Sequence, residues 1–136
     1  MRPISEILVD SLNSFEGGKR WCRGTLFLNK HRQSTISTQR KFSNQVKDAE
    51  SFCAYGAILK NMHEHGELNE NPFANETASG KKLVNSIEHL LAGATVHNRR
   101  VVMTNDQARD FSTVKDMFCT GIKRALEEET NNDSDD

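Results

Sequence analysis

The chain has 136 residues, a hydrophobic content of 35% and a formal net charge of −1, which together suit one domain with a modest core. No apolar run approaches the roughly 18 residues of a membrane-spanning helix, and Glu6 and Asp10 stand where a secretory signal has its apolar region, so we expect a cytoplasmic protein. The three cysteines, Cys22, Cys53 and Cys119, are odd in number and widely spaced, which excludes a disulfide framework and indicates reduced thiols.

The spacing of apolar residues predicts a first helix over about residues 5–15. Its apolar face consists of Ile4, Leu8, Leu12 and Phe15. Ser5 is the expected N-cap, and the pair Gly17-Gly18 is a stop signal. The apolar stretch that follows, residues 21–28, predicts an extended segment or a short strand.

Residues 29–46 are polar and almost without periodicity, so they predict a loop, with a hairpin near Ile36 as an open alternative. A second helix is expected from Asp48, as its cap, to Gly66. Gly56 falls inside this helix, where glycine is less favourable than alanine by about 1 kcal/mol. We therefore expect another helix to pass close to Gly56.

A polar connector, residues 67–80, leads to a third helix expected over about residues 79–92. Residues 99–103 predict a short strand that closes in a turn at Asn105 and Asp106. The last helix is expected over about residues 112–128, and the acidic residues 129–136 predict a disordered tail.

These elements predict a single globular domain over residues 1–128. The fold is mainly α, with about four helices and room for one short two-stranded β element. The alternative is an α+β fold in which residues 26–28 pair with residues 101–103, and such pairing would bring Trp21 near Asn105.

The charges are segregated along the chain. Residues 17–46 contain no acid but seven bases, which are Lys19, Arg20, Arg23, Lys30, Arg32, Arg40 and Lys41. Residues 127–136 contain six acids and no base. The basic loop, about residues 29–46, and the acidic tail could neutralise each other within one chain or between two copies, or could serve separate partners. A homo-oligomer therefore stays open.

The basic segment is the strongest binding candidate. Basic side chains attract phosphate, and interleaved aromatic rings can stack on bases, so residues 19–41 predict a nucleotide or nucleic-acid binder as one alternative. Aromatic side chains are interleaved here as Trp21, Phe27, His31 and Phe42. Dedicated nucleic-acid domains are usually basic overall, and this chain is slightly acidic. A protein partner is therefore the leading expectation.

A second candidate ligand site combines Trp21 with Asn105 and Asp106. Such a site would supply an aromatic wall and polar tips. The alternative is that Asn105 and Asp106 hold a loop by hydrogen bonds from side chain to backbone.

Catalytic and metal-binding readings have weaker support. Cys53, one of the histidines at positions 63, 89 and 97, and Asn105 would supply the parts of a Cys-dependent enzyme, but the residues around Cys53 indicate core packing. His63 and His65 point to different faces of a helix, which does not suit a shared metal. Residues 17–20 follow a helix rather than a strand and form no phosphate loop. We predict no catalytic residue, metal or cofactor.

Three motifs are present in order: W-x-x-G at Trp21–Gly24, aromatic-C-x-x-G-A-[IL] at Phe52–Ile58, and a late N-D pair at Asn105–Asp106. Together they resemble a family of small bacterial and phage proteins of unknown function, over about residues 5–126. The chain departs from that family at residues 26–29, where an Ala-Arg-Asp-like step is usual, and in its longer basic loop. The resemblance implies a shared fold and a cytosolic or phage-encoded origin, and it implies no activity.

The leading hypothesis is therefore a non-enzymatic interaction protein that binds another macromolecule, in a host cell if the protein is phage-encoded. Its basis is the segregated charge together with the lack of a coherent catalytic set.

Overall fold

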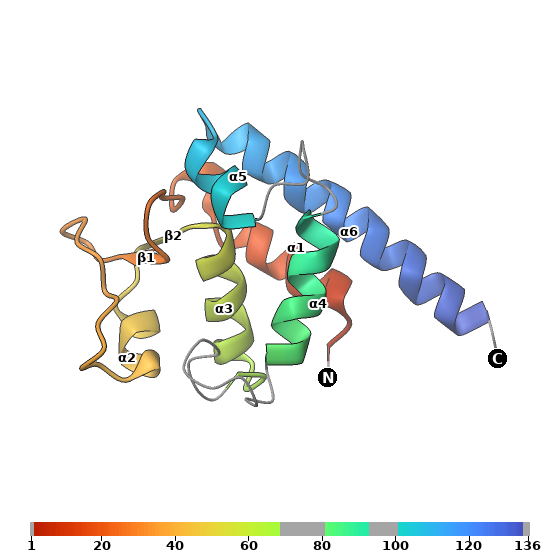
Figure 1. Cartoon of the computed structure of the whole chain (residues 1–136), viewed down its shortest axis with the longest axis horizontal. Helices are drawn as coiled ribbons and strands as arrows, with labels where there is room; N and C mark the ends of the chain where they lie inside the picture. The colour runs from red at the N-terminus through yellow and green to blue at the C-terminus, as the bar shows by residue number, and fades with distance from the viewer. Residues whose placement is uncertain (1, 69–80, 93–100, 135–136) are drawn as a thin grey trace.

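The computed structural model describes residues 2–68, 81–92 and 101–134, and these form six α-helices and a two-stranded antiparallel sheet (Figure 1). The helices are α1 (Ile4–Asn13), α2 (Phe42–Lys47), α3 (Ala54–Glu64), α4 (Lys81–Ala92), α5 (Val101–Gln107) and α6 (Phe111–Ser134). The short elements are the 3-10 helix η1 (Glu16–Gly18) and the strands β1 (Phe27–Leu28) and β2 (Ser51–Phe52). The mainly α class with a short β element is confirmed.

The helical body is built around α6. Helix α1 packs against α6 and α3, α4 packs against α6, and α5 lies against both α3 and α6. The strands and α2 project from this body at one end of the molecule (Figure 1). Phe15 connects the two parts, because its ring centroid lies 6.0 Å from that of Phe52 in β2 and 5.9 Å from that of Phe118 in α6. All three rings are fully buried, so the sheet and the helical body share one core.

The start of α1 differs from the predicted cap. Pro3 takes the N-cap position, and Ser5 lies inside the helix. The Ser5 backbone N–H and hydroxyl donate to the two carboxylate oxygens of Glu129, at 3.0 and 2.7 Å. A carboxylate suits a helix N-terminus because it satisfies a free N–H and faces the positive end of the dipole.

Helix α6 runs to Ser134, so residues 129–134 are helical where composition predicts a disordered tail. Composition did not anticipate this because the contact of Glu129 with Ser5 joins residues far apart in the sequence. The last two residues of the predicted tail, 135–136, lie outside the described residues.

The predicted pairing of residues 26–28 with residues 101–103 is wrong. β1 pairs with β2 instead, with Phe27 opposite Phe52, and residues 101–107 form α5. Val101, Thr104 and Asn105 are the buried residues of α5, and their spacing is that of one helical face. The β-branched residues Val101 and Val102 favour a strand locally, and this is why the sequence predicts one here.

The second predicted helix begins later than expected. Asp48 does not cap it but follows α2, a short helix within the predicted loop, and residues 51–52 belong to β2. The N-cap of α3 is Cys53, whose Sγ accepts from the Gly56 N–H at 3.3 Å.

The close approach at Gly56 is real, but the neighbouring segment is not a helix. A Cβ placed on Gly56 would lie 2.2 Å from the carbonyl oxygen of Leu26, in the bent segment that leads into β1. That same oxygen accepts from the Cys53 N–H at 3.1 Å. Because Gly56 has no side chain, the segment before β1 can lie directly on the first turn of α3.

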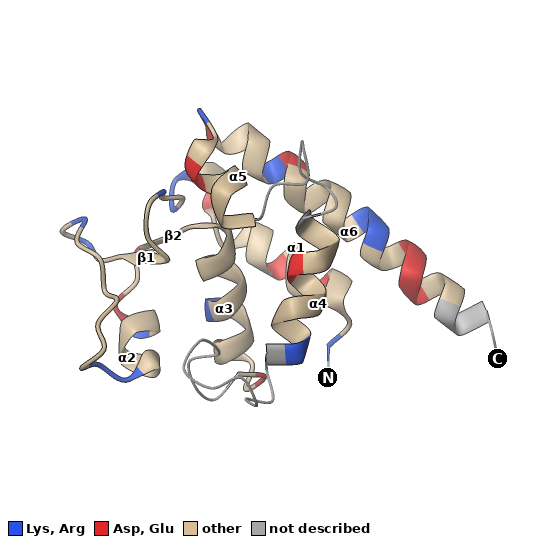
Figure 2. Cartoon of the chain, viewed as in Figure 1, with Lys and Arg blue, Asp and Glu red and all other residues tan. Residues whose placement is uncertain are grey.

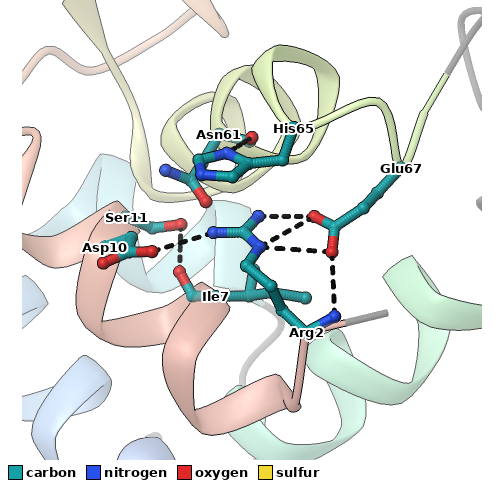
Figure 3. A network of polar contacts seen from close by, with 7 residues as sticks. All are labelled: Arg2, Ile7, Asp10, Ser11, Asn61, His65 and Glu67. Atoms are coloured by element: carbon teal, nitrogen blue, oxygen red, sulfur yellow. Dashed lines mark hydrogen bonds and ion pairs between the residues drawn. The ribbon is translucent and has the colours of Figure 1, made fainter.

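A nearly enclosed ion-pair network ties the start of α1 to the end of α3 (Figure 3). The Arg2 guanidinium donates to both carboxylate oxygens of Glu67 from Nε, at 3.2 Å each, and to Asp10 from Nη1, at 2.9 Å. The side chains of Arg2 and Glu67 are only 13% and 8% exposed. The hydrogen bonds from Arg2 hold the pKa of Glu67 below its ordinary value of 4.5.

We expect the substitution Glu67→Gln to lower the free energy of unfolding by about 2 kcal/mol at neutral pH, because it removes charge-assisted hydrogen bonds. Since the folded pKa of Glu67 is depressed, its contribution is complete above pH 4.5 and is lost as the pH falls through the lower folded pKa. Urea unfolding from neutral to acidic pH should show this acid-dependent loss in the wild type and a smaller loss in the variant. If the free energies of unfolding of the wild type and of the variant fell in parallel with pH, Glu67 would not be the source of this acid-dependent loss.

The matched control is Glu64→Gln. Glu64 pairs with Lys60, but its side chain is 53% exposed. An exposed i,i+4 pair contributes about 0.5 kcal/mol or less, so this variant should unfold almost like the wild type.

Candidate binding surface

The predicted binding residues between positions 19 and 41 gather in one part of the molecule. We call residues 19–50 the basic lobe; they include β1, α2 and the chain that leads to β2. The lobe forms the left end of the molecule, and Lys and Arg mark its loops (Figure 2).

The lobe contains a tight loop, residues 29–33, which we call the basic finger. Its backbone is closed by the Asn29 N–H bonded to the Gln33 carbonyl, at 2.8 Å. The Asn29 side-chain oxygen accepts from the N–H groups of His31 and Gln33, at 2.9 and 3.0 Å. Lys30, His31 and Arg32 at its tip are exposed. Within the described residues, none of these three side chains makes a hydrogen bond or ion pair.

Arg32 has a backbone φ of +61°. This left-handed conformation disfavours a side chain by roughly 1–2 kcal/mol. The bonds made by Asn29 hold the turn in place, so the finger presents its bases from a fixed loop. Strained residues of this kind concentrate at functional sites.

Two of the arginines predicted to bind a partner make hydrogen bonds to backbone carbonyls within the protein. Arg20 donates from Nε to the Glu50 carbonyl at 2.8 Å and lies over the Phe52 ring at 4.8 Å. Arg23 donates from Nη1 to the Ala108 carbonyl at 2.8 Å. Arg20 thus supports the chain before β2, and Arg23 ties the lobe to the segment between α5 and α6.

Arg40 is also engaged, because its guanidinium pairs with Asp48 and reaches the Thr35 carbonyl at 3.4 Å. The predicted bases that keep exposed side chains without a hydrogen bond or ion pair in the described part of the chain are Lys19, Lys30, Arg32 and Lys41. The basic segment therefore has about half of its predicted positive charge available to a partner.

Of the aromatic side chains of the segment, only His31 is exposed for stacking on bases. Phe27 is fully buried and Phe42 is 7% exposed. Trp21 is half-buried, and the Arg23 guanidinium lies 5.6 Å from its ring. The lobe therefore presents its cations with one exposed imidazole and no fully exposed Phe or Trp ring, whereas single-stranded nucleic-acid binders use such rings as stacking platforms.

Trp21 and Asn105 do meet, although not through the predicted strand pairing. Asn105 is fully buried on α5. Its Oδ1 accepts from Trp21 Nε1 and from the Ala54 N–H, at 2.8 Å each. Its Nδ2 donates to the Cys22 carbonyl at 3.0 Å and to Asp106 Oδ1 at 3.2 Å. Every hydrogen-bonding position of the amide is occupied, which favours a structural role over ligand binding.

Asp106 extends this junction by accepting from the Gly24 N–H at 2.9 Å. Gly24 has a φ of +85°, which suits glycine at this turn. The three motifs behind the family resemblance thus meet at one place, where α5 fastens the W-x-x-G turn and the first turn of α3. Packing of the fold is a sufficient reason for these residues.

The surroundings of Cys53 and Cys22 favour a packing role for these two thiols. Cys53 and Cys22 are buried, at 2% and 4% exposure. Burial raises the pKa of Cys53 to about 11 and that of Cys22 to about 12, so neither is a thiolate at neutral pH. Of the histidines considered as partners, His63 bonds the Leu68 carbonyl at 3.0 Å, and position 97 lies outside the described residues.

We expect only Cys119 to react with iodoacetamide in the folded protein at neutral pH. Cys119 is exposed on α6, whereas the other two thiols are buried and protonated. Peptide mass spectrometry after a timed reaction should find the label on Cys119, and the protein unfolded in urea should carry it on all three cysteines. Labelling of Cys53 as fast as Cys119 would contradict this burial.

Within residues 2–68, 81–92 and 101–134, no group of three His, Cys, Asp or Glu side chains is placed to hold a metal ion. No helix they form is both long and apolar enough to cross a membrane.

The fold and surface together define a mainly helical protein with a projecting lobe of exposed bases. No protein-family model, curated protein or solved structure matches this chain. Asn29, which closes the basic finger, was not among the residues predicted for the site. Asparagine favours turns, so its identity could have indicated this loop. Most of the residues around it are also polar, so the asparagine did not stand out.

Proposed function

We propose that the protein is a non-enzymatic interaction module that acts in the cytoplasm and binds an acidic surface of a protein partner through its basic lobe. The observation that carries this proposal is the basic finger. Lys30, His31 and Arg32 stand exposed on a loop closed by its own backbone, and no described side chain neutralises them. The resemblance to bacterial and phage proteins supports a host protein as the partner.

A protein partner suits this surface better than a nucleic acid. The rings of Phe27 and Phe42 are buried, and the chain as a whole is slightly acidic. A few cations with a single exposed imidazole suit a limited acidic patch, whereas a nucleic acid would need a longer run of phosphate contacts.

The experiment compares two variants purified gently from cells that express the protein naturally. The first carries Lys30→Gln and Arg32→Gly, which remove the charges of the finger. Glycine accepts the positive φ of residue 32, so the fold should persist. The control carries Lys82→Gln and Lys115→Gln, which remove two exposed lysines outside the lobe.

Native mass spectrometry should show one stoichiometric protein adduct on the wild type and on the control, and its loss from the finger variant. A protein adduct retained by the finger variant would overturn the proposal. An adduct removed by nuclease, with steep salt dependence, would replace it with the nucleic-acid alternative.

A further inference from the structure

Cys22 and Cys53 are neighbours on two segments of the chain that run parallel. Trp21 pairs with Phe52 in a short parallel bridge. The Phe52 N–H donates to the Arg20 carbonyl at 2.8 Å, and the Cys22 N–H donates to the Phe52 carbonyl at 3.0 Å. Because paired residues in parallel segments advance together, the next pair along this bridge is Cys22 and Cys53.

Asn105 marks the place where the two segments separate. In a regular parallel ladder, the next hydrogen bond would join the Ala54 N–H directly to the Cys22 carbonyl. Here the Asn105 amide is inserted into that bond, because its Oδ1 accepts from the Ala54 N–H at 2.8 Å and its Nδ2 donates to the Cys22 carbonyl at 3.0 Å. Cys22 and Cys53 are therefore the last neighbours before the gap that this amide fills.

The two thiols are also close enough to interact electrostatically. Burial is the main cause that raises the pKa of Cys22 to about 12, and the negative charge of a Cys53 thiolate is the next cause. The effect of such a charge falls with distance, so the two sulfur atoms lie near each other. Cys22 is the nearer of the two to solvent along the chain, because the exposed residues Arg23 and Gly24 follow it directly.

We infer that Cys22 and Cys53 are a redox-active pair, which a peroxide oxidises to a disulfide within the folded protein. The Cys22 thiolate attacks one oxygen of hydrogen peroxide and the O–O bond breaks, which gives a sulfenic acid on Cys22 and one water. The Cys53 thiolate then attacks the Cys22 sulfur. The S–S bond forms, and the sulfenic oxygen leaves with the Cys53 proton as a second water. The two sulfurs together lose two electrons, and these reduce the peroxide.

This disulfide would close a loop around the basic lobe. Residues 23–52 lie between the two cysteines and include the basic finger, β1 and α2. A cross-link across a long loop restricts the unfolded chain, so the oxidised protein should be more stable than the reduced protein. The inference does not depend on what the lobe binds, because the pair is buried and the finger is exposed.

The test uses the variant Cys119→Ser, which removes the exposed thiol and keeps the pair. The folded protein is treated with excess hydrogen peroxide, quenched, unfolded in urea and labelled with iodoacetamide. We expect two labels before oxidation, none after it, and two again once a thiol reductant has been added. Peptide mass spectrometry should find positions 22 and 53 in one cross-linked product from a single chain.

The rate of oxidation and the stability of the product give two further readouts. Burial raises the pKa of both thiols, to about 12 for Cys22 and about 11 for Cys53. The thiolate is the reactive form, so the rate should rise by about 10-fold per pH unit above neutral pH. The midpoint of thermal unfolding of the oxidised protein should rise by about 5–10 °C.

Two control variants in the same background keep one thiol of the pair. Cys22→Ala leaves Cys53, and Cys53→Ser leaves Cys22 with a good N-cap residue at position 53. A single thiol in excess peroxide proceeds to sulfinic and sulfonic acids, which a thiol reductant does not reverse. Labels lost from these variants should therefore stay lost, whereas the pair recovers both of its labels.

Four results would each overturn the inference. The folded pair could keep both labels under conditions that oxidise the same chain unfolded in urea. The reductant could fail to restore the labels of the pair. The cross-link could join two chains instead of one. Finally, the midpoint of thermal unfolding could fall on oxidation, which would show that the two segments must be distorted to bring the sulfurs together.

Discussion

The substitution Asn105→Ala is expected to lower the free energy of unfolding by about 3–5 kcal/mol. It removes one buried amide that serves three segments of the chain. The Trp21 indole N–H, the Ala54 N–H and the Cys22 carbonyl would each lose the partner they have in the folded protein. A buried polar group without a partner costs about 1–3 kcal/mol, and the cavity left by the amide adds to this.

Urea unfolding followed by Trp21 fluorescence measures this effect directly, because Trp21 is the only tryptophan and itself bonds Asn105. Asp106→Ala is the matched control. Asp106 lies next to Asn105 on α5, is exposed and accepts from the Gly24 N–H, so its loss should destabilise by only about 1 kcal/mol. Equal effects of the two substitutions would show that Asn105 does not hold the junction.

The substitution Gly56→Ala is expected to destabilise the protein by about 3 kcal/mol, although alanine is the better helix former. The new Cβ would lie 2.2 Å from the Leu26 carbonyl oxygen, which is backbone and cannot rotate away. The segment before β1 must move, and the hydrogen bond from the Cys53 N–H to the Leu26 carbonyl would be strained or lost. The midpoint of thermal unfolding should fall clearly.

Gly121→Ala is the control for this substitution. Gly121 also lies in a helix, and its added Cβ would lie 2.5 Å from Leu91. The atom in the way is a side-chain methyl, which can move aside, and the gain in helix propensity is about 1 kcal/mol. Gly121→Ala should therefore change stability much less. If Gly56→Ala were equally mild, the close approach of the chain before β1 would be wrong.

The sequence predicted the long helices well, because their burial follows a simple period. The apolar faces of α1, α4 and α6 are local patterns that need no knowledge of distant contacts. It failed for α5, where β-branched residues at 101 and 102 suggested a strand. It placed a short strand within residues 21–28, where β1 lies, but gave it the wrong partner, because the true partner lies across the basic segment. Strand pairing and short helices depend on contacts that the local sequence does not contain.

The exposed bases of the candidate surface also depend on contacts that the local sequence does not reveal. The excess of bases between residues 17 and 46 was plain from the sequence, but its division into structural and exposed side chains was not. Arg20 and Arg32 have the same chemistry, and only the fold places a backbone carbonyl within reach of Arg20. Asn105 was expected in a turn after a strand, yet it lies fully buried on α5.

The contact between Ser5 and Glu129 has a consequence for synthesis. Helix α1 finds its packing surface and the carboxylate at its N-terminus on α6, which is made last among the helices described here. Although α3 can cover part of the apolar face of α1, the part that packs against α6 stays uncovered on the ribosome until α6 emerges. Such late, long-range closure slows folding and leaves the nascent chain prone to aggregation. A chaperone that shields apolar helices should therefore raise the yield of folded protein.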